Sequence, residues 1–125
     1  MKRIIKTLKA PAAIGPYSQA VEINGTLYIS GQIAIDPATG KLVDGDITAQ
    51  TIQVFRNIEA ILQAAGYSFI EVVKSTVFLS NMADFKTMND VYSRYYFENH
   101  PARAAFAVKE LPMGALIEIE TIAVK

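Results

Sequence analysis

The sequence contains no cysteine and only one histidine, His100. The lack of cysteine excludes disulfide bonds, a thiol nucleophile, and zinc or iron–sulfur sites that need thiolate ligands. A single histidine excludes a metal site built from several histidines and any catalytic scheme that needs a histidine pair. We therefore expect a protein that works without a metal or another cofactor.

The chain also lacks an excess of charge of either sign, because its 12 basic side chains balance its 12 acidic ones. Nucleic-acid binding needs clustered positive charge, so we expect no nucleic-acid partner. No apolar run approaches the roughly 18 to 20 residues of a membrane span. The basic N-terminus is not followed by a long apolar segment, as it would be in a signal peptide. These features predict a cytoplasmic protein that does not contact membranes.

The length of 125 residues is typical of one domain, and 51% of the residues are hydrophobic. Such a chain buries a core without a disulfide or metal. We find no linker, repeat or low-complexity segment, and we treat residues 1–125 as a single domain. Hydrophobic periodicity and turn residues predict strands at 3–7, 20–23, 26–30, 71–79, 104–110 and 115–124, and helices at 48–65 and 82–98.

Local signals mark the ends of these elements. Asn24-Gly25 is a strong hairpin turn, and residues 36–40 form a cluster of turn residues. Gly66 is placed to end the first helix in a left-handed conformation. Asn81 is placed to cap the second helix, and His100 to interact with the dipole at its C-terminal end. The element order predicts an α+β fold with two helices on one face of a mixed sheet.

The last predicted strand carries apolar side chains on both of its faces. If the helices cover one face, the other face presents Leu116, Ile122 and Val124 together with Glu118 and Glu120. An apolar face of this kind is typical of a subunit interface. A half-solvated sheet with ordinary surface glutamates explains the same pattern equally well.

Two charged residues on the closing strands are candidates for chemistry. Arg103 lies among small apolar residues, where its guanidinium is suited to bind a carboxylate, although an edge arginine in a salt bridge fits the same pattern. Glu118 lies in the middle of a strand, where burial would raise its pKa and prepare it for proton transfer. It would equally suit a salt bridge to a neighbouring chain, together with Glu120.

Two short N-terminal motifs supply further candidates. Tyr17 belongs to the loop Gly15-Pro16-Tyr17-Ser18-Gln19, and loops of this kind often carry binding residues, although a packed surface tyrosine looks the same. Ser30-Gly31-Gln32 ends a strand with a glycine, where backbone N–H groups would approach a ligand or form a plain bulge. A Ser–His–Asp triad has little support, because no histidine lies near Ser30 in the sequence.

These motifs together resemble the RidA (YjgF, reactive intermediate deaminase) family. The resemblance rests on the two N-terminal motifs and on Pro101-Ala102-Arg103-Ala104-Ala105-Phe106-Ala107-Val108-Lys109-Glu110-Leu111 followed by Ile117-Glu118-Ile119, and it extends over essentially the whole chain. It implies a chorismate-mutase-like fold, a homotrimer with ligand clefts between subunits, and hydrolysis of 2-imino acids to 2-keto acids and ammonia. Such imines and their enamine tautomers escape from pyridoxal-phosphate enzymes, so the implied role is detoxification.

The resemblance also assigns roles to individual residues. Arg103 matches the arginine that holds the substrate carboxylate, and Glu118 matches the glutamate that handles water. The other residues implied to bind substrate are Tyr17, Ser30, Gly31, Asn89 and Ala105. Many deaminase members carry cysteine where this chain has Ala105, so this departure weakens the assignment of the substrate more than that of the reaction. The rival functions are a keto-acid-binding regulatory protein of the same fold and an endoribonuclease that inhibits translation.

Overall fold

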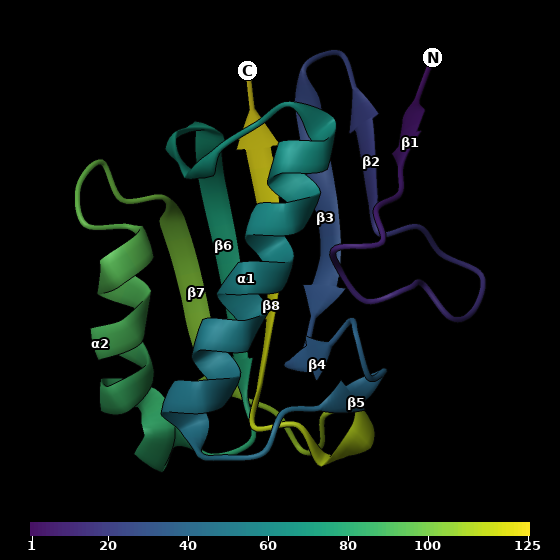
Figure 1. The fold of residues 1–125 in the computed structure, drawn as a ribbon. Helices are drawn as coiled ribbons and strands as arrows, with labels where there is room; N and C mark the ends of the chain where they lie inside the picture. The colour runs from purple at the N-terminus through teal and green to yellow at the C-terminus, as the bar shows by residue number, and fades with distance from the viewer.

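A mixed six-stranded sheet forms the framework of the protein, seen here in a computed structural model that describes all 125 residues (Figure 1). The strands follow the spatial order β1-β2-β3-β8-β6-β7, and only β6 and β7 are parallel. Their bounds are β1 Arg3–Ile5, β2 Ala20–Ile23, β3 Thr26–Gln32, β6 Val72–Leu79, β7 Ala102–Ala107 and β8 Ile117–Val124. A separate hairpin consists of β4 (Ile35–Asp36) and β5 (Lys41–Leu42).

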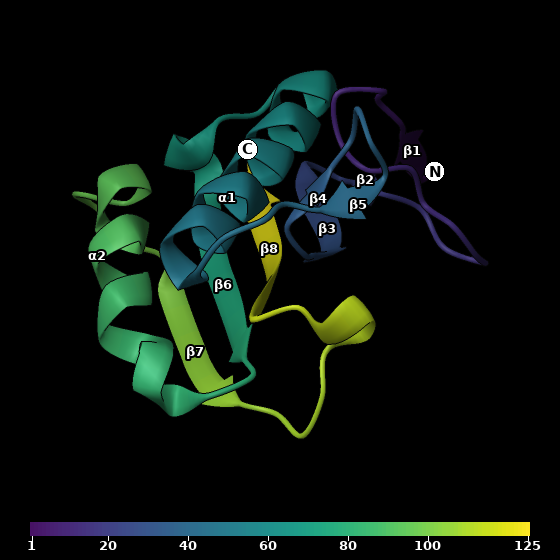
Figure 2. The same cartoon turned by 60° about the horizontal axis from the view of Figure 1, so that its bottom comes forward.

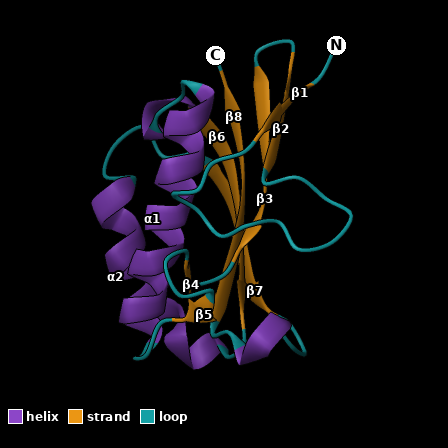
Figure 3. Cartoon of the chain, turned by 45° about the vertical axis from the view of Figure 1, so that its right-hand side comes forward, coloured by secondary structure: helices purple, strands orange, loops and turns teal.

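Two helices, α1 (Ile47–Ala65) and α2 (Phe85–Tyr95), cover one face of this sheet and leave the other face open (Figure 3). The prediction of an α+β fold with both helices on one face is therefore confirmed. Short 3₁₀ turns at Phe69–Glu71, Met82–Asp84 and Pro112–Gly114 lie in the connections. None of the helices combines the length and apolar character needed to cross a membrane.

The core lies between the sheet and the two helices. On β8, the buried side chains of Ile117, Ile119, Thr121 and Ala123 alternate with less buried ones. This alternation places Glu118, Glu120, Ile122 and Val124 on the open face, as the strand pattern predicts. Leu116 differs from the expectation, because it precedes β8 and packs against the edge of the core. Its backbone N–H donates to Oε1 of the buried Gln50 on α1.

The boundaries of α1 follow from its capping residues. Asp46 accepts a hydrogen bond from the Ala49 N–H at 3.1 Å, which satisfies one free donor of the first turn. At the other end Gly66 has φ 85°, the left-handed conformation that the sequence predicts there. The predicted helix differs from the observed one by a single residue at its N-terminal end, where no capping residue was assigned from the sequence.

The predicted boundaries of α2 are wrong at both ends. Asn81 caps the preceding 3₁₀ turn by accepting from the Ala83 N–H, and α2 itself begins at Phe85. The helix ends at Tyr95, so His100 lies five residues beyond it, too far to interact with the dipole, which acts within the last turn. His100 instead lines a cavity next to Arg103.

Both ends of the chain contact the C-terminal end of α1. Arg3 Nη2 donates to the carbonyl oxygen of Ala65 at 2.9 Å, and Lys125 Nζ donates to that of Gly66 at 2.6 Å. Glu22 accepts from Arg3 Nε at 2.9 Å and from the Tyr67 hydroxyl at 2.5 Å. We call Arg3, Glu22, Tyr67 and Lys125 the terminal clamp.

Candidate active site

The two residues predicted to carry the chemistry lie on opposite faces of the sheet. Arg103 is paired in register with Ser75, which is fully buried beneath the helices. Glu118 is paired with Phe78 and projects from the open face. Each lines a different cavity, so a single chain does not bring Arg103 and Glu118 together.

Arg103 is held by α2, which lies alongside the edge strand β7 (Figure 2). Its Nη1 donates to Asn89 Oδ1 at 2.7 Å. Its guanidinium carbon lies 4.8 Å from the ring centroid of Tyr92 and 5.5 Å from that of Phe85. Phe85, Asn89 and Tyr92 are spaced four and three residues apart, so they share one side of the helix. This aromatic and amide support fixes the guanidinium while its other N–H groups stay free for a carboxylate.

Buried hydroxyl groups lie close to this arginine. The hydroxyls of Tyr92 and Ser75 are buried near each other and near Arg103, and neither makes a hydrogen bond of good geometry. Burial raises the pKa of Tyr92, which keeps the phenol neutral under the guanidinium. A cavity of about 480 Å³ opens here, and its lining includes Asn89, Tyr92, Tyr96, His100 and Arg103. Ala105 lies two residues further along β7, packed at the edge of the core.

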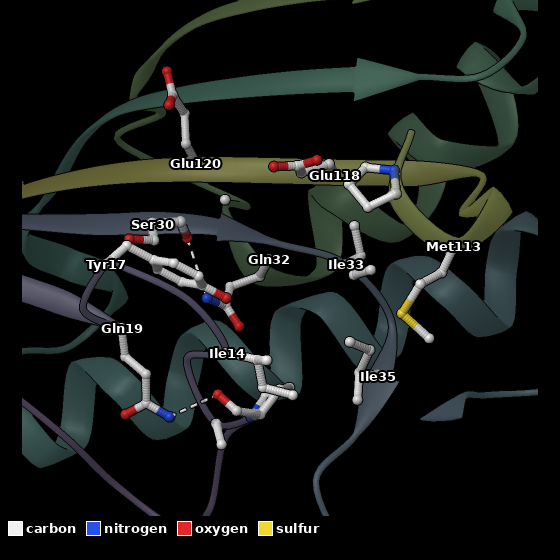
Figure 4. A pocket seen from close by; sticks show the side chains of 14 residues that line it. Ile14, Tyr17, Gln19, Ser30, Gln32, Ile33, Ile35, Met113, Glu118 and Glu120 are labelled. Carbon is white, nitrogen blue, oxygen red and sulfur yellow. Dashed lines mark hydrogen bonds between the residues drawn. The ribbon is translucent and has the colours of Figure 1, made fainter. Parts of the chain in front are cut away.

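Glu118 occupies a larger cavity of about 730 Å³ on the open face, together with Glu120, Tyr17, Ser30 and Gly31 (Figure 4). Partial burial is the main reason why the pKa of Glu118 is raised, and the neighbouring Glu120 carboxylate adds to the effect. Glu118 is therefore a stronger base than an ordinary surface glutamate. A raised pKa is the property needed in a residue that takes a proton from water.

Position 31 accommodates only glycine, because the Glu118 carboxylate occupies the space that a side chain would need. A Cβ atom built on Gly31 would collide with Glu118 Oε2, Cδ and Cγ. The strand β3 is also irregular here, since its register with β8 shifts between Ile29 and Gln32. The glycine in the Ser30-Gly31-Gln32 motif thus lets the carboxylate lie directly against the backbone of the neighbouring strand.

The loop that carries Tyr17 forms another wall of this cavity. Ser30 Oγ donates to the Ser18 carbonyl oxygen at 2.6 Å, so Ser30 supports the loop from β3. The side chain of Tyr17 is 54% exposed. The structure therefore brings Tyr17, Ser30, Gly31 and Glu118 together on the open face.

Three residues that support these two sites carry no functional signal in the sequence. Phe85 and Tyr92 look like ordinary apolar positions of a helix, although an aromatic ring also binds a cation through its face. Gln19 belongs to one of the N-terminal motifs, but no role was expected for it. The spacing of Phe85, Asn89 and Tyr92 is visible in the sequence, but their contact with Arg103 depends on the packing of α2 against β7.

Comparisons with known proteins agree with this architecture. A family model described as Endoribonuclease L-PSP matches residues 7–125. A RutC family protein of Pyrococcus horikoshii is 56% identical over 100% of this chain and 99% of its own length. The 2-iminobutanoate/2-iminopropanoate deaminase of Bos taurus is 54% identical over 100% of this chain and 91% of its own.

A solved structure shares the fold over the whole chain. The crystal structure of a putative endoribonuclease from Thermotoga maritima superposes with a TM-score of 0.98 at 54% identity, covering 100% of this chain and 98% of that one. The similarity therefore extends over both cavities and over every strand and helix that positions them.

Proposed function

Because the chain belongs to the RidA (YjgF) family, as its match to the family model and its deaminase relatives show, we propose that it hydrolyses 2-imino acids to 2-keto acids and ammonia. The substrates proposed are 2-iminobutanoate and 2-iminopropanoate, together with their enamine tautomers. The observation that carries the proposal is a supported guanidinium, Arg103, in a chain that also holds a carboxylate of raised pKa, Glu118. These groups match the two needs of the reaction, which are a carboxylate clamp and a base for water.

The proposed reaction needs one water molecule and no other reactant. Arg103 binds the substrate carboxylate through paired N–H groups and holds the imine carbon in place. Glu118 accepts a proton from a water molecule while the water oxygen bonds to the imine carbon, and it then gives this proton to the former imine nitrogen, which yields a carbinolamine. Glu118 next moves the hydroxyl proton of the carbinolamine to its amino group as the C–N bond breaks, which releases ammonia and leaves the 2-keto acid.

A second copy of the chain is needed to complete this site. Because Arg103 and Glu118 lie on opposite faces of one sheet, we propose that Arg103 of one subunit meets Glu118, Tyr17 and Gly31 of the next. The open face suits such an assembly, since its side chains Tyr28, Phe106 and Val124 are 49%, 46% and 43% exposed in the single chain. The proposed assembly is a homotrimer with the chorismate-mutase-like fold.

The direct test couples this protein to a threonine dehydratase, which generates 2-iminobutanoate. The protein should accelerate the release of 2-ketobutanoate. Arg103→Ala should lower kcat/KM by roughly 30-fold to several thousand-fold, because truncating one partner of a desolvated charge pair costs about 2 to 5 kcal/mol. Arg103→Lys should recover only part of this loss, since it keeps the charge but loses the planar fork.

The control is the fold, because circular dichroism and oligomer mass should be unchanged in both variants. A folded Arg103→Ala protein that retains the wild-type rate would refute the carboxylate clamp. Binding of 2-ketobutanoate without hydrolysis of the imine would indicate a regulatory protein instead. RNA cleavage in place of imine hydrolysis would favour the endoribonuclease that the family model names.

A further inference from the structure

The long connection between β1 and β2 forms part of the open-face cavity, although it contains no helix or strand. It contributes Pro11, Ala12, Ile14 and Tyr17 to the wall. The Tyr17 hydroxyl makes no hydrogen bond within the chain, and its side chain is more than half exposed. The Tyr17 side chain is therefore held by no hydrogen bond of its own, and its position depends on the backbone of the loop that carries it.

A single buried side chain, Gln19, holds this loop together. Its Oε1 accepts from the Thr7 N–H at 2.7 Å, and its Nε2 donates to the carbonyl oxygens of Thr7 at 3.0 Å and Pro11 at 2.8 Å. Nε2 also lies 3.3 Å from the Ala10 carbonyl oxygen, so one of its two hydrogens is shared between acceptors. Gln19 is only 3% exposed, and both ends of its amide are satisfied by the loop backbone.

Gln19 also links the loop to the sheet beneath the cavity. Its own carbonyl oxygen accepts from the Ser30 N–H at 3.0 Å, next to the bond from Ser30 Oγ to Ser18. Gln19 thus connects the start of the loop to β3, because its side chain bonds to Thr7 and its backbone carbonyl bonds to Ser30. Tyr17 lies two residues before this tie, on the cavity side (Figure 4).

We propose that Gln19 is a positioning residue, which fixes residues 6–18 as a wall of the cavity and acts on the reaction through Tyr17. This inference rests on the proposed function, because it requires Tyr17 to contact the substrate. Only an amide of this length supplies both the acceptor and the donors. Glutamate would keep the acceptor but place a charge against three carbonyl oxygens, and methionine would keep the size but lose every hydrogen bond.

The first test measures the loop directly by limited trypsin cleavage after Lys9. Gln19→Glu and Gln19→Met should each be cleaved at this bond at least about tenfold faster than the wild type, because cleavage follows the population of the opened loop. Gln63→Glu is the matched control, since it makes the same chemical change on the exposed side of α1. It should be cleaved at the wild-type rate.

A measurement on the wild-type chain needs no variant. The Thr7 amide should exchange its hydrogen slowly, because it donates to a buried side chain. Fast exchange at Thr7, or unchanged cleavage after Lys9 in folded Gln19 variants, would overturn the role of Gln19 in holding the loop. Circular dichroism identifies any variant that has not folded.

The second test asks whether Gln19 acts through Tyr17. Gln19→Met alone should lower kcat/KM for 2-iminobutanoate by about 10- to 100-fold, the cost of a misplacement of roughly 1 Å. In a Tyr17→Ala background the same change should cost less than about threefold, because the residue it positions is already gone. A purely structural role would give equal losses in both backgrounds and would overturn the proposal. An inactive wild-type protein would refute the proposed function, whereas Lys9 cleavage would still decide the role of Gln19.

Discussion

Glu118 combines two properties at the scale of a single residue, a raised pKa and contact with the backbone at Gly31. Because the folded chain binds the proton of Glu118 more tightly than the unfolded chain, ionisation of Glu118 opposes folding. The favourable contribution of the protonated carboxyl is complete below the unfolded pKa of about 4.3 and is lost as the pH rises through the higher folded value. Ionisation of Glu118 at higher pH therefore reduces stability.

Replacing Glu118 with glutamine should separate stability from activity. Glu118→Gln cannot ionise, so its Tm relative to the wild type should increase as the pH rises, and the difference should shrink as the pH falls toward about 4. The same change should lower kcat by about 10² to 10⁴, the range for a positioned acid or base. Thermal unfolding and the coupled assay measure the two effects. Wild-type turnover in the variant would return Glu118 to a structural role.

The two charged candidate residues could be predicted from the sequence, but the aromatic residues that contact Arg103 could not. Arg103 and Glu118 were identified from their motifs and their apolar neighbours. Tyr92 and Phe85 support Arg103 through ring faces, which look like ordinary core positions in a helical pattern. The sequence also does not show that Arg103 and Glu118 lie on opposite faces of the sheet, because this follows from the register of β7 on β6.

At the scale of elements, α1 depends on the two ends of the chain. Its last turn contains no basic residue, so no charge of its own offsets the negative end of its dipole. Arg3 from β1 and Lys125 from the chain end supply this charge at the Ala65 and Gly66 carbonyl oxygens. Burial, assisted by the Glu22 carboxylate, raises the pKa of Tyr67 to about 12, which keeps the phenol a donor to Glu22.

Removing these cations should weaken the attachment of α1 to the sheet. Arg3→Gln combined with Lys125→Gln should lower Tm, and the loss should diminish at about 0.5 M salt, which screens exposed charges. Lys41→Gln, on the exposed β4–β5 hairpin, is the control and should leave Tm unchanged. A loss of Tm that is independent of salt would show that the helix dipole is not what these cations stabilise.

The stability that the terminal clamp contributes should decrease in acid. The hydrogen bond that Glu22 accepts from Arg3 is the main cause of the lowered pKa of Glu22, followed by the bond from Tyr67. The contribution of Glu22 to stability is therefore present above its unfolded pKa of about 4.3 and is lost as the pH falls through the lower folded value. In the double variant, the part of this acid sensitivity that depends on Arg3 should disappear.

The helix with the clearest apolar pattern and a glycine at its end was the most accurately predicted element. The helix α1 has a clear apolar stripe between Asp46 and Gly66, and it was predicted within one residue. The end of α2 was not, because apolar residues continue past Tyr95 into the irregular segment before β7. The strands β4 and β5 each contain two residues, too few for any periodicity, so only the turn between them was predicted.

At the scale of the whole molecule, the open face should be covered by other copies of the chain. Light scattering at micromolar concentration should give about three times the chain mass of 13.7 kDa. Ile122→Lys places a charge in the middle of this face and should shift the mass toward the monomer. It should also abolish imine hydrolysis, because a single chain does not bring Arg103 and Glu118 together. A wild-type protein that is a monomer and fully active would refute the shared site.

The strand pattern predicted that one sheet face would stay apolar, whereas only the family resemblance implied that other subunits cover it. The alternation on β8 was correct for Ile122 and Val124, since their direction depends only on the strand period. Leu116 lies outside β8, where that period no longer applies. A surface glutamate and an interface glutamate have the same sequence pattern, so the strand alone does not distinguish the two roles.

The terminal clamp has a consequence for how the polypeptide can be rearranged. Arg3 and Lys125 bind consecutive carbonyl oxygens, and the two chain ends lie at the same end of the molecule in Figure 1. The Lys125 N–H also donates to the Gly25 carbonyl oxygen at 2.8 Å, so the C-terminus is anchored beside the β2–β3 turn. A short flexible linker would therefore join the ends without strain, and new ends opened at the exposed Gly40 turn would interrupt no strand of the large sheet. We therefore expect the fold to tolerate circular permutation, with new chain ends at the Gly40 turn.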